Sequence, residues 1–258
     1  MRKIRWYIAT IQTILCVGCA VSQNKFISVE TVQGIKDVCV PVLCGAPTPD
    51  NIFKITKMVG SGFFINNEGY FLTAGHVIDD WEKIDKSKGD CFPAVYFPVR
   101  GWDSGLTILT RWFPFADCVR PNDLDVAVCK TVDNPFIDPK TITRIKVATF
   151  DNSPSIADGT PVAFTGFPLN FQHPVTSIGH IASFIEIANL LIIDKAAWPG
   201  GSGSPVYLAN GKVVGVLTKW GINEGIGLSY AIKAKSILEF LSKNKIAFQS
   251  DKSQQDKK

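Results

Sequence analysis

The sequence predicts an all-β protein built from antiparallel strands, arranged as barrels or a sandwich, with a single helix near the C-terminus. Short apolar and β-branched runs recur through residues 59–235, and such runs are typical of strands. Turn-forming dipeptides separate the runs at short intervals. Helical stretches do not alternate with the runs, which argues against a doubly wound sheet.

The strand signals follow one another along the chain. They lie at residues 63–65, 70–73, 126–128, 144–148, 162–164, 190–193 and 213–217. The intervening turns include Glu68-Gly69, Asp158-Gly159 and Asn210-Gly211. The aromatic-rich stretch 81–118 is expected to hold further strands with elaborated loops. Residues 233–243 place apolar side chains at helical spacing, which predicts one C-terminal helix that packs on the sheet.

Composition narrows the class of protein. The 258 residues are 46% hydrophobic and include 21 Gly and 15 Pro, which is typical of a well-buried, turn-rich globular chain of one large β domain or two smaller ones. Three of the 27 basic residues fall in the first five positions, and no acidic residue precedes Glu30. The rest of the chain is close to neutral, so its charge gives no reason to expect nucleic-acid binding.

Residues 1–19 predict a signal peptide. Basic side chains (Arg2, Lys3 and Arg5) precede the apolar stretch 6–17, and small residues follow it. The stretch is short and interrupted by polar residues, which argues against a membrane span. An uncleaved amphipathic anchor is the alternative. We therefore expect export, to the periplasm in a bacterium and otherwise by secretion.

The end of this signal resembles a bacterial lipobox. Residues 15–19 read Leu-Cys-Val-Gly-Cys, in which Cys16 stands where Leu is usual. The resemblance implies acylation of Cys19 and a lipid anchor in the outer membrane. A free mature N-terminus is the alternative.

Five cysteines follow the signal region, and an exported protein permits disulfides. We expect Cys39 and Cys44 to close a small local loop and Cys91 and Cys118 to close another, with Cys129 as a buried thiol. A zinc site is the alternative, but the chain has no Cys-x-x-Cys and only three His.

Three short segments carry residues suited to nucleophilic acyl transfer. They contain, in order, His76 after a predicted strand, Asp125 before an apolar run, and Ser202 within Gly-Gly-Ser-Gly-Ser. This chemistry needs a hydroxyl, an imidazole to take its proton and a carboxylate to orient the imidazole. It also needs N–H groups aimed at the oxyanion, which a glycine-rich turn can supply.

The segments around these residues resemble those of the chymotrypsin-like serine peptidases, most closely the bacterial high-temperature-requirement (Do-like) and glutamyl-endopeptidase branches. The resemblance covers residues 59–248, and its motifs occur in the family's order with domain-scale spacing. The matching segments are Gly60-Ser61-Gly62-Phe63, 69–77, 179–183, 194–202, 203–206 and 225–232.

The resemblance implies two antiparallel six-stranded β-barrels followed by the C-terminal helix. It implies that Ser202 is the nucleophile, His76 the general base and then acid, and Asp125 the orienting carboxylate. The N–H groups of Gly200 and Ser202 would form the oxyanion hole. The expected activity is that of a serine endopeptidase acting on proteins or peptides without metal or organic cofactor. Nothing in the sequence predicts an oligomeric state.

Alternative residues exist for two of these roles. Asp123 competes with Asp125, because residues two apart on a strand point to the same face. Asp125 is favoured since it directly precedes residues 126–128, as in the family. His173 and His180 are rival bases, and His180 is expected to be structural because the sequence places no acidic residue close to it.

The resemblance also locates the pocket for the residue before the scissile bond. Ala196 brings no charge to the pocket base, so a substrate Lys or Arg would lack a counter-ion. Leu217 adds an apolar wall, and we expect small or medium aliphatic side chains to be preferred. The alternative is that Lys219 points inward and favours acidic residues. Thr218 is the other candidate for that position, with Lys219 then directed to solvent.

The chain departs from the family at Gly201, where digestive peptidases have Asp and bacterial relatives commonly have Asn. Without an Asp there, a new N-terminus cannot form an activating salt bridge, so zymogen-type activation is not expected. The additional glycine is expected to loosen the oxyanion loop.

We expect residues 20–58 to form an N-terminal segment and residues 59–135 and 140–248 to form the barrels. Residues 249–258 are expected to be a disordered polar tail. The segment 203–258 is too short for a PDZ domain in addition to the last strands and helix.

Two other functions fit parts of the pattern. A non-catalytic, protease-like binding module would not need the intact set of His76, Asp125 and Ser202. An esterase could use the same three residues, but the surrounding segments match peptidases. The strand–helix alternation of α/β-hydrolases is also missing.

Overall fold

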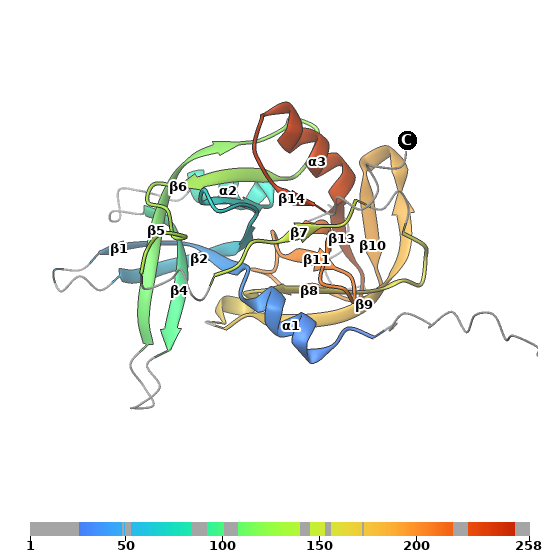
Figure 1. The fold of residues 1–258 in the computed structure, drawn as a ribbon, viewed down its shortest axis with the longest axis horizontal. Helices are drawn as coiled ribbons and strands as arrows, with labels where there is room; N and C mark the ends of the chain where they lie inside the picture. Colours follow the sequence, from blue (N-terminus) through green and yellow to red (C-terminus); the bar gives the residue numbers. More distant parts are fainter. Residues whose placement is uncertain are drawn as a thin grey trace, which may run out of the picture.

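The computed structural model describes residues 26–47, 49, 53–83, 92–100, 108–139, 145–152, 156–171, 173–218 and 227–250. Within them two six-stranded β-barrels lie side by side (Figure 1). Three helices accompany the barrels: α1 (Val29–Lys36), α2 (Gly75–Glu82) and α3 (Ala234–Lys243). The predicted all-β class, the two barrels and the C-terminal helix are confirmed.

The first barrel closes in the order β1-β2-β3-β6-β5-β4, with antiparallel pairing throughout. Its strands are β1 (Cys39–Pro47), β2 (Phe53–Phe64), β3 (Tyr70–Thr73), β4 (Phe92–Arg100), β5 (Ile108–Val119) and β6 (Ala127–Thr131). The aromatic-rich stretch contributes the antiparallel strands β4 and β5, and Phe113 and Phe115 pack in the barrel core with Phe71 and Phe64. These aromatic side chains therefore fill the first barrel.

The second barrel also closes, because β11 pairs with both β8 and β12. Its strands are β8 (Pro161–Gly166), β9 (Val175–Ile185), β10 (Leu190–Ile193), β11 (Pro205–Tyr207), β12 (Val213–Thr218) and β13 (Ser229–Lys233). Two short strands, β7 (Thr149–Phe150) and β14 (Gln249–Ser250), extend the sheet from β12 by parallel pairing. Two 3-10 turns, η2 (Pro168–Asn170) and η3 (Glu186–Ala188), follow β8 and β9.

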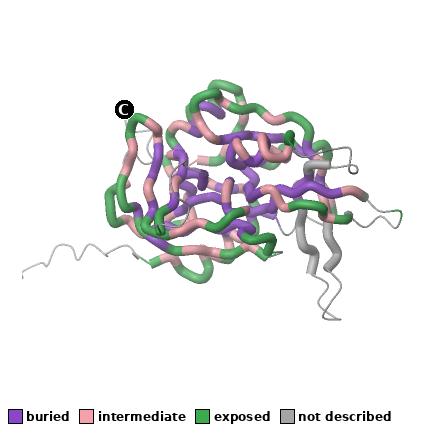
Figure 2. The backbone as a smooth tube through the Cα atoms, turned by 180° about the vertical axis from the view of Figure 1, so that it is seen from behind, coloured by how far each residue is buried: buried purple, intermediate pink, exposed green. Residues whose placement is uncertain are grey.

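One hydrophobic cluster joins the barrels to α3. It includes Phe63, Leu72 and Val126 from the first barrel, Val213, Val216 and Ile232 from the second, and Ile237 and Leu241 from α3. Figure 2 shows the buried backbone running through the centre of the molecule. Burial of this shared surface fixes the barrels relative to each other, so loops from both can form one site at their junction.

Helices α1 and α2 were not expected from the sequence. The Ser28 hydroxyl caps α1 by accepting a hydrogen bond from the Thr31 N–H at 3.1 Å. Glu30 and Lys36 lie at its N- and C-terminal ends, where their charges complement the helix dipole. Both helices have only eight residues, which is too short for hydrophobic periodicity to reveal them.

Three expected boundaries are wrong. The first barrel begins with β1, upstream of the predicted start at residue 59. Residues 145–148 form no strand, and β7 begins only at Thr149. The predicted polar tail also begins too early, because Gln249 and Ser250 pair with β7. Strand pairing determines the first and third boundaries, because β1 pairs with β2 and β4, and β14 pairs with β7.

The expected cysteine pairing is wrong. Cys118 forms a disulfide with Cys129, its direct neighbour across β5 and β6. Cys44 is also disulfide-bonded, and Cys39 is a buried free thiol. Strand register brings Cys118 and Cys129 opposite each other, and spacing along the sequence does not show this register. Cys91 lies outside the described residues.

The predicted signal segment 1–19, including Cys19, lies outside the described residues. Among the residues that the structure describes, no helix has the length and apolar character needed to cross a membrane.

Candidate active site

The turn after β3 places His76 in the first turn of α2. Ala74 is extended (φ −75°, ψ 147°) and caps the helix, while Val77 is buried in the first barrel. Gly75 leaves room for a close approach, because a Cβ there would lie 2.9 Å from Oδ1 of Asp125. The absence of a side chain at Gly75 therefore lets Asp125 reach the backbone of His76.

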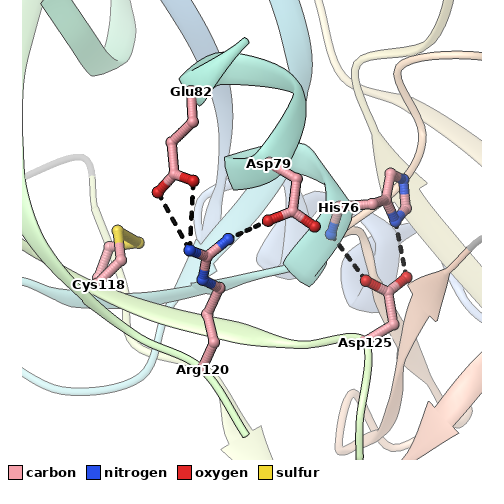
Figure 3. Close-up of polar contacts among 7 residues, drawn as sticks. His76, Asp79, Glu82, Cys118, Arg120 and Asp125 are labelled. Atoms are coloured by element: carbon pink, nitrogen blue, oxygen red, sulfur yellow. Dashed lines mark hydrogen bonds and ion pairs between the residues drawn. A yellow bond between two sulfur atoms is a disulfide. The ribbon is translucent and has the colours of Figure 1, made fainter. Parts of the chain in front are cut away.

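Asp125 accepts three hydrogen bonds from two segments of the chain. The His76 N–H donates to Oδ1 at 2.7 Å, and Nδ1 of the same residue lies 2.7 Å from Oδ2 (Figure 3). The Thr218 hydroxyl at the end of β12 also donates to Oδ2. The His76 and Asp125 side chains are 21% and 30% exposed. The carboxylate is thus held between the first barrel and the second.

Competing effects act on the pKa of Asp125. Burial is the largest single effect and raises it, but the hydrogen bonds from His76 and Thr218 and the attraction of the imidazolium charge together lower the pKa below its ordinary value. An ionised carboxylate accepts the Nδ1 proton of His76. This hydrogen bond leaves Nε2 of the neutral ring able to accept a proton.

Ser202 lies in the loop between β10 and β11, half-buried against the segment that leads to His76. The Ser61 N–H donates to the Ser202 carbonyl at 2.8 Å. The next residue, Gly203, has a φ of +88°, and a Cβ there would lie 3.0 Å from the Ala74 nitrogen. The loop that carries Ser202 therefore packs directly on the turn that carries His76.

Within the described residues, no hydrogen bond joins the imidazole of His76 to the hydroxyl of Ser202. Hydrogen bonds between a base and a nucleophile are often long until substrate binds.

Two N–H groups of the Ser202 loop, those of Gly200 and Ser202 itself, donate no hydrogen bond to any described residue. The N–H groups of their neighbours are paired: Gly201 donates to the Trp198 carbonyl at 2.9 Å and Gly203 to the Leu217 carbonyl at 2.8 Å. The loop therefore keeps two unpaired donors beside Ser202, which is what stabilisation of an oxyanion requires.

The family model of the trypsin-like peptidase domain matches residues 60–216, a stretch that contains His76, Asp125 and Ser202. The chain belongs to the trypsin-like peptidase family. In this trypsin-like peptidase, the matched stretch begins in β2 and ends in β12, so it spans both barrels.

Curated relatives of this trypsin-like peptidase include a probable periplasmic serine endoprotease, DegP-like, from Pseudomonas savastanoi pv. phaseolicola. It is 31% identical over 189 residues, which are 69% of this chain and 33% of that protein. A protein of the same description from Pseudomonas fulva is 26% identical over 244 residues, or 87% of this chain and 44% of that protein. The chain thus spans less than half the length of either relative.

A solved structure shows the same fold. The crystal structure of the serine endoprotease from Yersinia pestis matches with a TM-score of 0.58 and 21% sequence identity. The match covers 84% of this trypsin-like peptidase and 67% of the other chain.

The rival residues lie elsewhere in this trypsin-like peptidase. Asp123 is exposed and forms no hydrogen bond with His76 in the described part of the chain, where His76 pairs with Asp125. His173 is exposed. His180 has an acidic partner that the sequence did not reveal: its Nδ1 lies 3.1 Å from Oδ2 of Asp194, across β9 and β10. His180 therefore already has a carboxylate partner of its own, on the outside of the second barrel.

The expected specificity residues are only partly brought together. Ala196 is half-buried before Ser202, and Leu217 is buried in the second barrel. A Cβ on Gly201 would lie 3.5 Å from Cδ2 of Leu217, so Leu217 lies directly behind the Ser202 loop. Thr218 directs its hydroxyl to Asp125. Lys219 lies outside the described residues.

The peptide groups on both sides of Gly201 are held, although extra freedom was expected here. Its N–H donates to the Trp198 carbonyl, and its own carbonyl accepts from the Ser204 N–H at 3.1 Å.

In the part of the chain that the structure describes, no group of three or more His, Cys, Asp or Glu side chains could hold a metal ion.

Sequence reasoning did not foresee the roles of two residues of the site: Thr218 was considered only for the pocket, and Ser61 was given no role. Thr218 ends a strand that the sequence did predict, but its contact with Asp125 crosses from one barrel to the other. Ser61 lies in the segment Gly60-Ser61-Gly62-Phe63, which resembles the family but indicates no role for this residue. Neither contact leaves a local sequence signal, because each joins residues more than 90 positions apart.

Proposed function

We propose that the chain is a serine endopeptidase that hydrolyses peptide bonds in protein substrates. The observation that carries this proposal is the pairing of His76 with Asp125 beside the Ser202 loop, in which the N–H groups of Gly200 and Ser202 have no partner among the described residues. Family membership and the DegP-like relatives support the same activity.

In the first half-reaction the Ser202 hydroxyl oxygen forms a bond to the substrate carbonyl carbon, and its proton passes to Nε2 of His76. The carbonyl oxygen takes the negative charge and accepts hydrogen bonds from the N–H groups of Gly200 and Ser202. Asp125 stabilises the imidazolium through Nδ1. The C–N bond then breaks, His76 returns the proton to the leaving amine, and the substrate acyl group stays on Ser202 as an ester.

In the second half-reaction a water molecule takes the place of the amine. His76 accepts one proton of the water as its oxygen bonds to the acyl carbon, and the same N–H groups receive the oxyanion. Collapse breaks the ester bond, and His76 returns the proton to the Ser202 oxygen. The released product is a carboxylic acid, and the residues that act regain their initial protonation.

Activity on casein tests the proposal. Ser202→Ala and His76→Ala are each expected to lower hydrolysis by several orders of magnitude while the fold is kept. Ser183→Ala, which removes an exposed hydroxyl from β9, is the matched control and should cleave at the wild-type rate. A Ser202→Ala chain that cleaves casein like the wild type would refute the proposal.

We propose that the residue before the scissile bond is small or aliphatic. Ala196 carries no charge, and Leu217 presents only apolar atoms behind the Ser202 loop. Cleavage-site profiling on a peptide library should give cuts after aliphatic residues. Dominant cuts after Glu or Asp that disappear in Lys219→Ala would instead assign the pocket to Lys219.

We further propose that the protein is exported to the periplasm and anchored through acylated Cys19. The DegP-like relatives are named as periplasmic, and the basic start and apolar stretch of residues 1–19 support export. Mass spectrometry of the mature N-terminus should find a diacylglyceryl Cys19. A free terminus between Ala20 and Gln23 would refute the anchor while leaving export intact.

A further inference from the structure

In the peptide groups that link residues 199–203, every carbonyl and N–H is hydrogen-bonded to a described residue except for two N–H groups. Hydrogen bonds run from the Leu169 N–H to the Pro199 carbonyl (2.7 Å), from Gly201 to Trp198 (2.9 Å), from Ser204 to Gly201 (3.1 Å) and from Gly203 to Leu217 (2.8 Å). The two N–H groups left unpaired among the described residues are those proposed to receive the oxyanion. The direction of these donors therefore depends on the anchors around them.

Ser61, on β2 of the first barrel, supplies two further anchors, to the carbonyls of Gly200 and Ser202. Its hydroxyl donates to the Gly200 carbonyl at 2.7 Å and accepts from the Phe167 N–H at 2.8 Å. Its N–H donates to the Ser202 carbonyl at 2.8 Å. Ser61 is itself fully buried, and its carbonyl accepts from the Thr73 hydroxyl at 2.7 Å. One residue thus holds the carbonyl groups on both sides of the Gly201–Ser202 peptide.

The loop needs such anchors because its own residues do not restrict it. Gly200 has a φ of +89° and is followed by Gly201, and glycine gives a loop more conformational freedom than other residues. A peptide group is planar, so a carbonyl held at one end also fixes the N–H at the other. The Gly201–Ser202 peptide, which carries the Ser202 N–H, lies between the two peptides that Ser61 holds.

The Ser61 hydroxyl also influences the direction of the Gly200 N–H, through the η2 turn. By accepting from the Phe167 N–H it fixes the start of η2, where Leu169 adopts a left-handed φ of 52° and donates to the Pro199 carbonyl. In a trans peptide the carbonyl and the N–H point in opposite directions. Anchoring the Pro199 carbonyl to η2 therefore turns the Gly200 N–H away from η2.

We propose that the Ser61 hydroxyl is a positioning group that sets the oxyanion hole by tying the Gly200 carbonyl and the η2 turn to strand β2. The inference rests on the proposed peptidase function and adds a residue outside the His76, Asp125 and Ser202 set. Ser61 does not touch substrate. It acts on the N–H groups of Gly200 and Ser202.

The test compares Ser61→Ala with wild type in kinetics on a fluorogenic peptide taken from a casein site that the wild-type chain cleaves. Loss of the hydroxyl should lower kcat by about tenfold or more, less than the loss of an oxyanion donor itself, while KM changes little. The rate of phosphonylation by a fluorophosphonate, whose oxygen uses the same donors, should fall by a similar factor.

Thr131→Val is the matched control, because it also removes a buried hydroxyl that donates to a backbone carbonyl, that of Gly69 at 3.2 Å, but on β6. It should lower the melting temperature as much as Ser61→Ala does and leave kcat unchanged. If Ser61→Ala does not fold, Ser61→Cys, which keeps a weaker donor, should give an intermediate kcat.

The outcomes separate this inference from the proposed function. A folded Ser61→Ala or Ser61→Cys chain with wild-type kcat and phosphonylation rate would overturn the role of Ser61 alone. A loss confined to KM, or one shared by Thr131→Val, would also overturn it. A wild-type chain that neither cleaves casein nor reacts with the fluorophosphonate would refute the proposed function, and this inference with it.

Discussion

Thr218, the last residue of β12 in the second barrel, donates its hydroxyl hydrogen to the carboxylate of Asp125, which lies just before β6 in the first. The same oxygen is bonded to Nδ1 of His76. The geometry of the His76–Asp125 pair therefore depends on how the two barrels pack, as well as on the turn that carries His76.

Thr218→Val should weaken activity without abolishing it. The variant keeps the shape of the side chain but removes a hydrogen bond to a charged group, and the pKa of Asp125 should rise as a result. We expect kcat/KM on casein to fall by about tenfold. Thr218→Ser, which keeps the hydroxyl, should be close to wild type, and equal activity of the Val and Ser variants would contradict the role of the hydroxyl.

Asp125 should make stability depend on acidity. Burial raises the pKa of Asp125 in the folded protein, but the hydrogen bonds from His76 and Thr218, together with the attraction of the imidazolium charge, lower it further than burial raises it. The pKa in the folded protein is therefore lower than the ordinary value for Asp. As the pH falls, Asp125 therefore binds a proton in the unfolded chain before it does so in the folded protein. The ionised carboxylate stabilises the fold above the ordinary Asp pKa of about 3.9, and this stabilisation is lost as the pH falls from that value through the lower pKa of the folded protein.

Urea unfolding at about pH 6 and about pH 3 measures this dependence. The wild type should lose more unfolding free energy between these conditions than Asp125→Asn, which cannot titrate at this position. Equal losses in the two proteins would show that Asp125 does not contribute to the acid sensitivity of the fold.

Gly203→Ala should damage the fold. Gly203 has a φ of +88°, and a Cβ there would lie 2.0 Å from the Ser61 carbonyl oxygen and 2.5 Å from the Thr73 hydroxyl. Gly159→Ala is the matched control, since Gly159 has a φ of +77° but no atom within 4 Å of an added Cβ. The control should lose about 1–2 kcal/mol through its backbone alone.

Soluble yield and urea unfolding free energy measure both variants. Gly203→Ala should lose clearly more unfolding free energy than Gly159→Ala, or fail to accumulate as a folded chain. Similar unfolding free energies would contradict this prediction, because they would mean that the Ser202 loop and β2 can move apart to admit a Cβ without loss of stability.

Cys39 should resist alkylation in the native protein. Burial raises the pKa of its thiol, with a further upward effect from the Asp37 charge, and the thiol donates to the Thr165 carbonyl at 3.4 Å. A protonated, buried thiol is a poor nucleophile. After native treatment with iodoacetamide and non-reducing digestion, Cys39 should be unmodified and a Cys118–Cys129 cross-linked peptide present. A Cys39–Cys44 cross-link would contradict the structure.

Much of the architecture could be predicted from local pattern. The run at residues 190–193 coincides with β10, and the run at 70–73 with β3, because short apolar stretches bounded by turns determine both. The two barrels followed from the family resemblance rather than from periodicity. The short helices α1 and α2 gave no periodic signal, and the start of the first barrel depends on β1, which pairs with β2 and β4.

The candidate site divides in the same way. His76, Asp125 and Ser202 each stand in a recognisable segment, and the structure brings His76 and Asp125 into contact. The contact of Thr218 with Asp125, the contacts of Ser61 and the Cys118–Cys129 bond were missed, because each depends on strand register or on the contact between barrels. Such contacts arise only when the chain is folded, so spacing along the sequence cannot reveal them.

The most direct test of the central proposal is to treat the purified chain with a fluorophosphonate and map the modified residue by mass spectrometry. An activated serine nucleophile attacks phosphorus, whereas ordinary serine hydroxyls do not react. We expect one phosphonyl group, on Ser202, and no modification in His76→Ala. Modification of another residue, or none in the folded wild-type chain, would contradict the proposal.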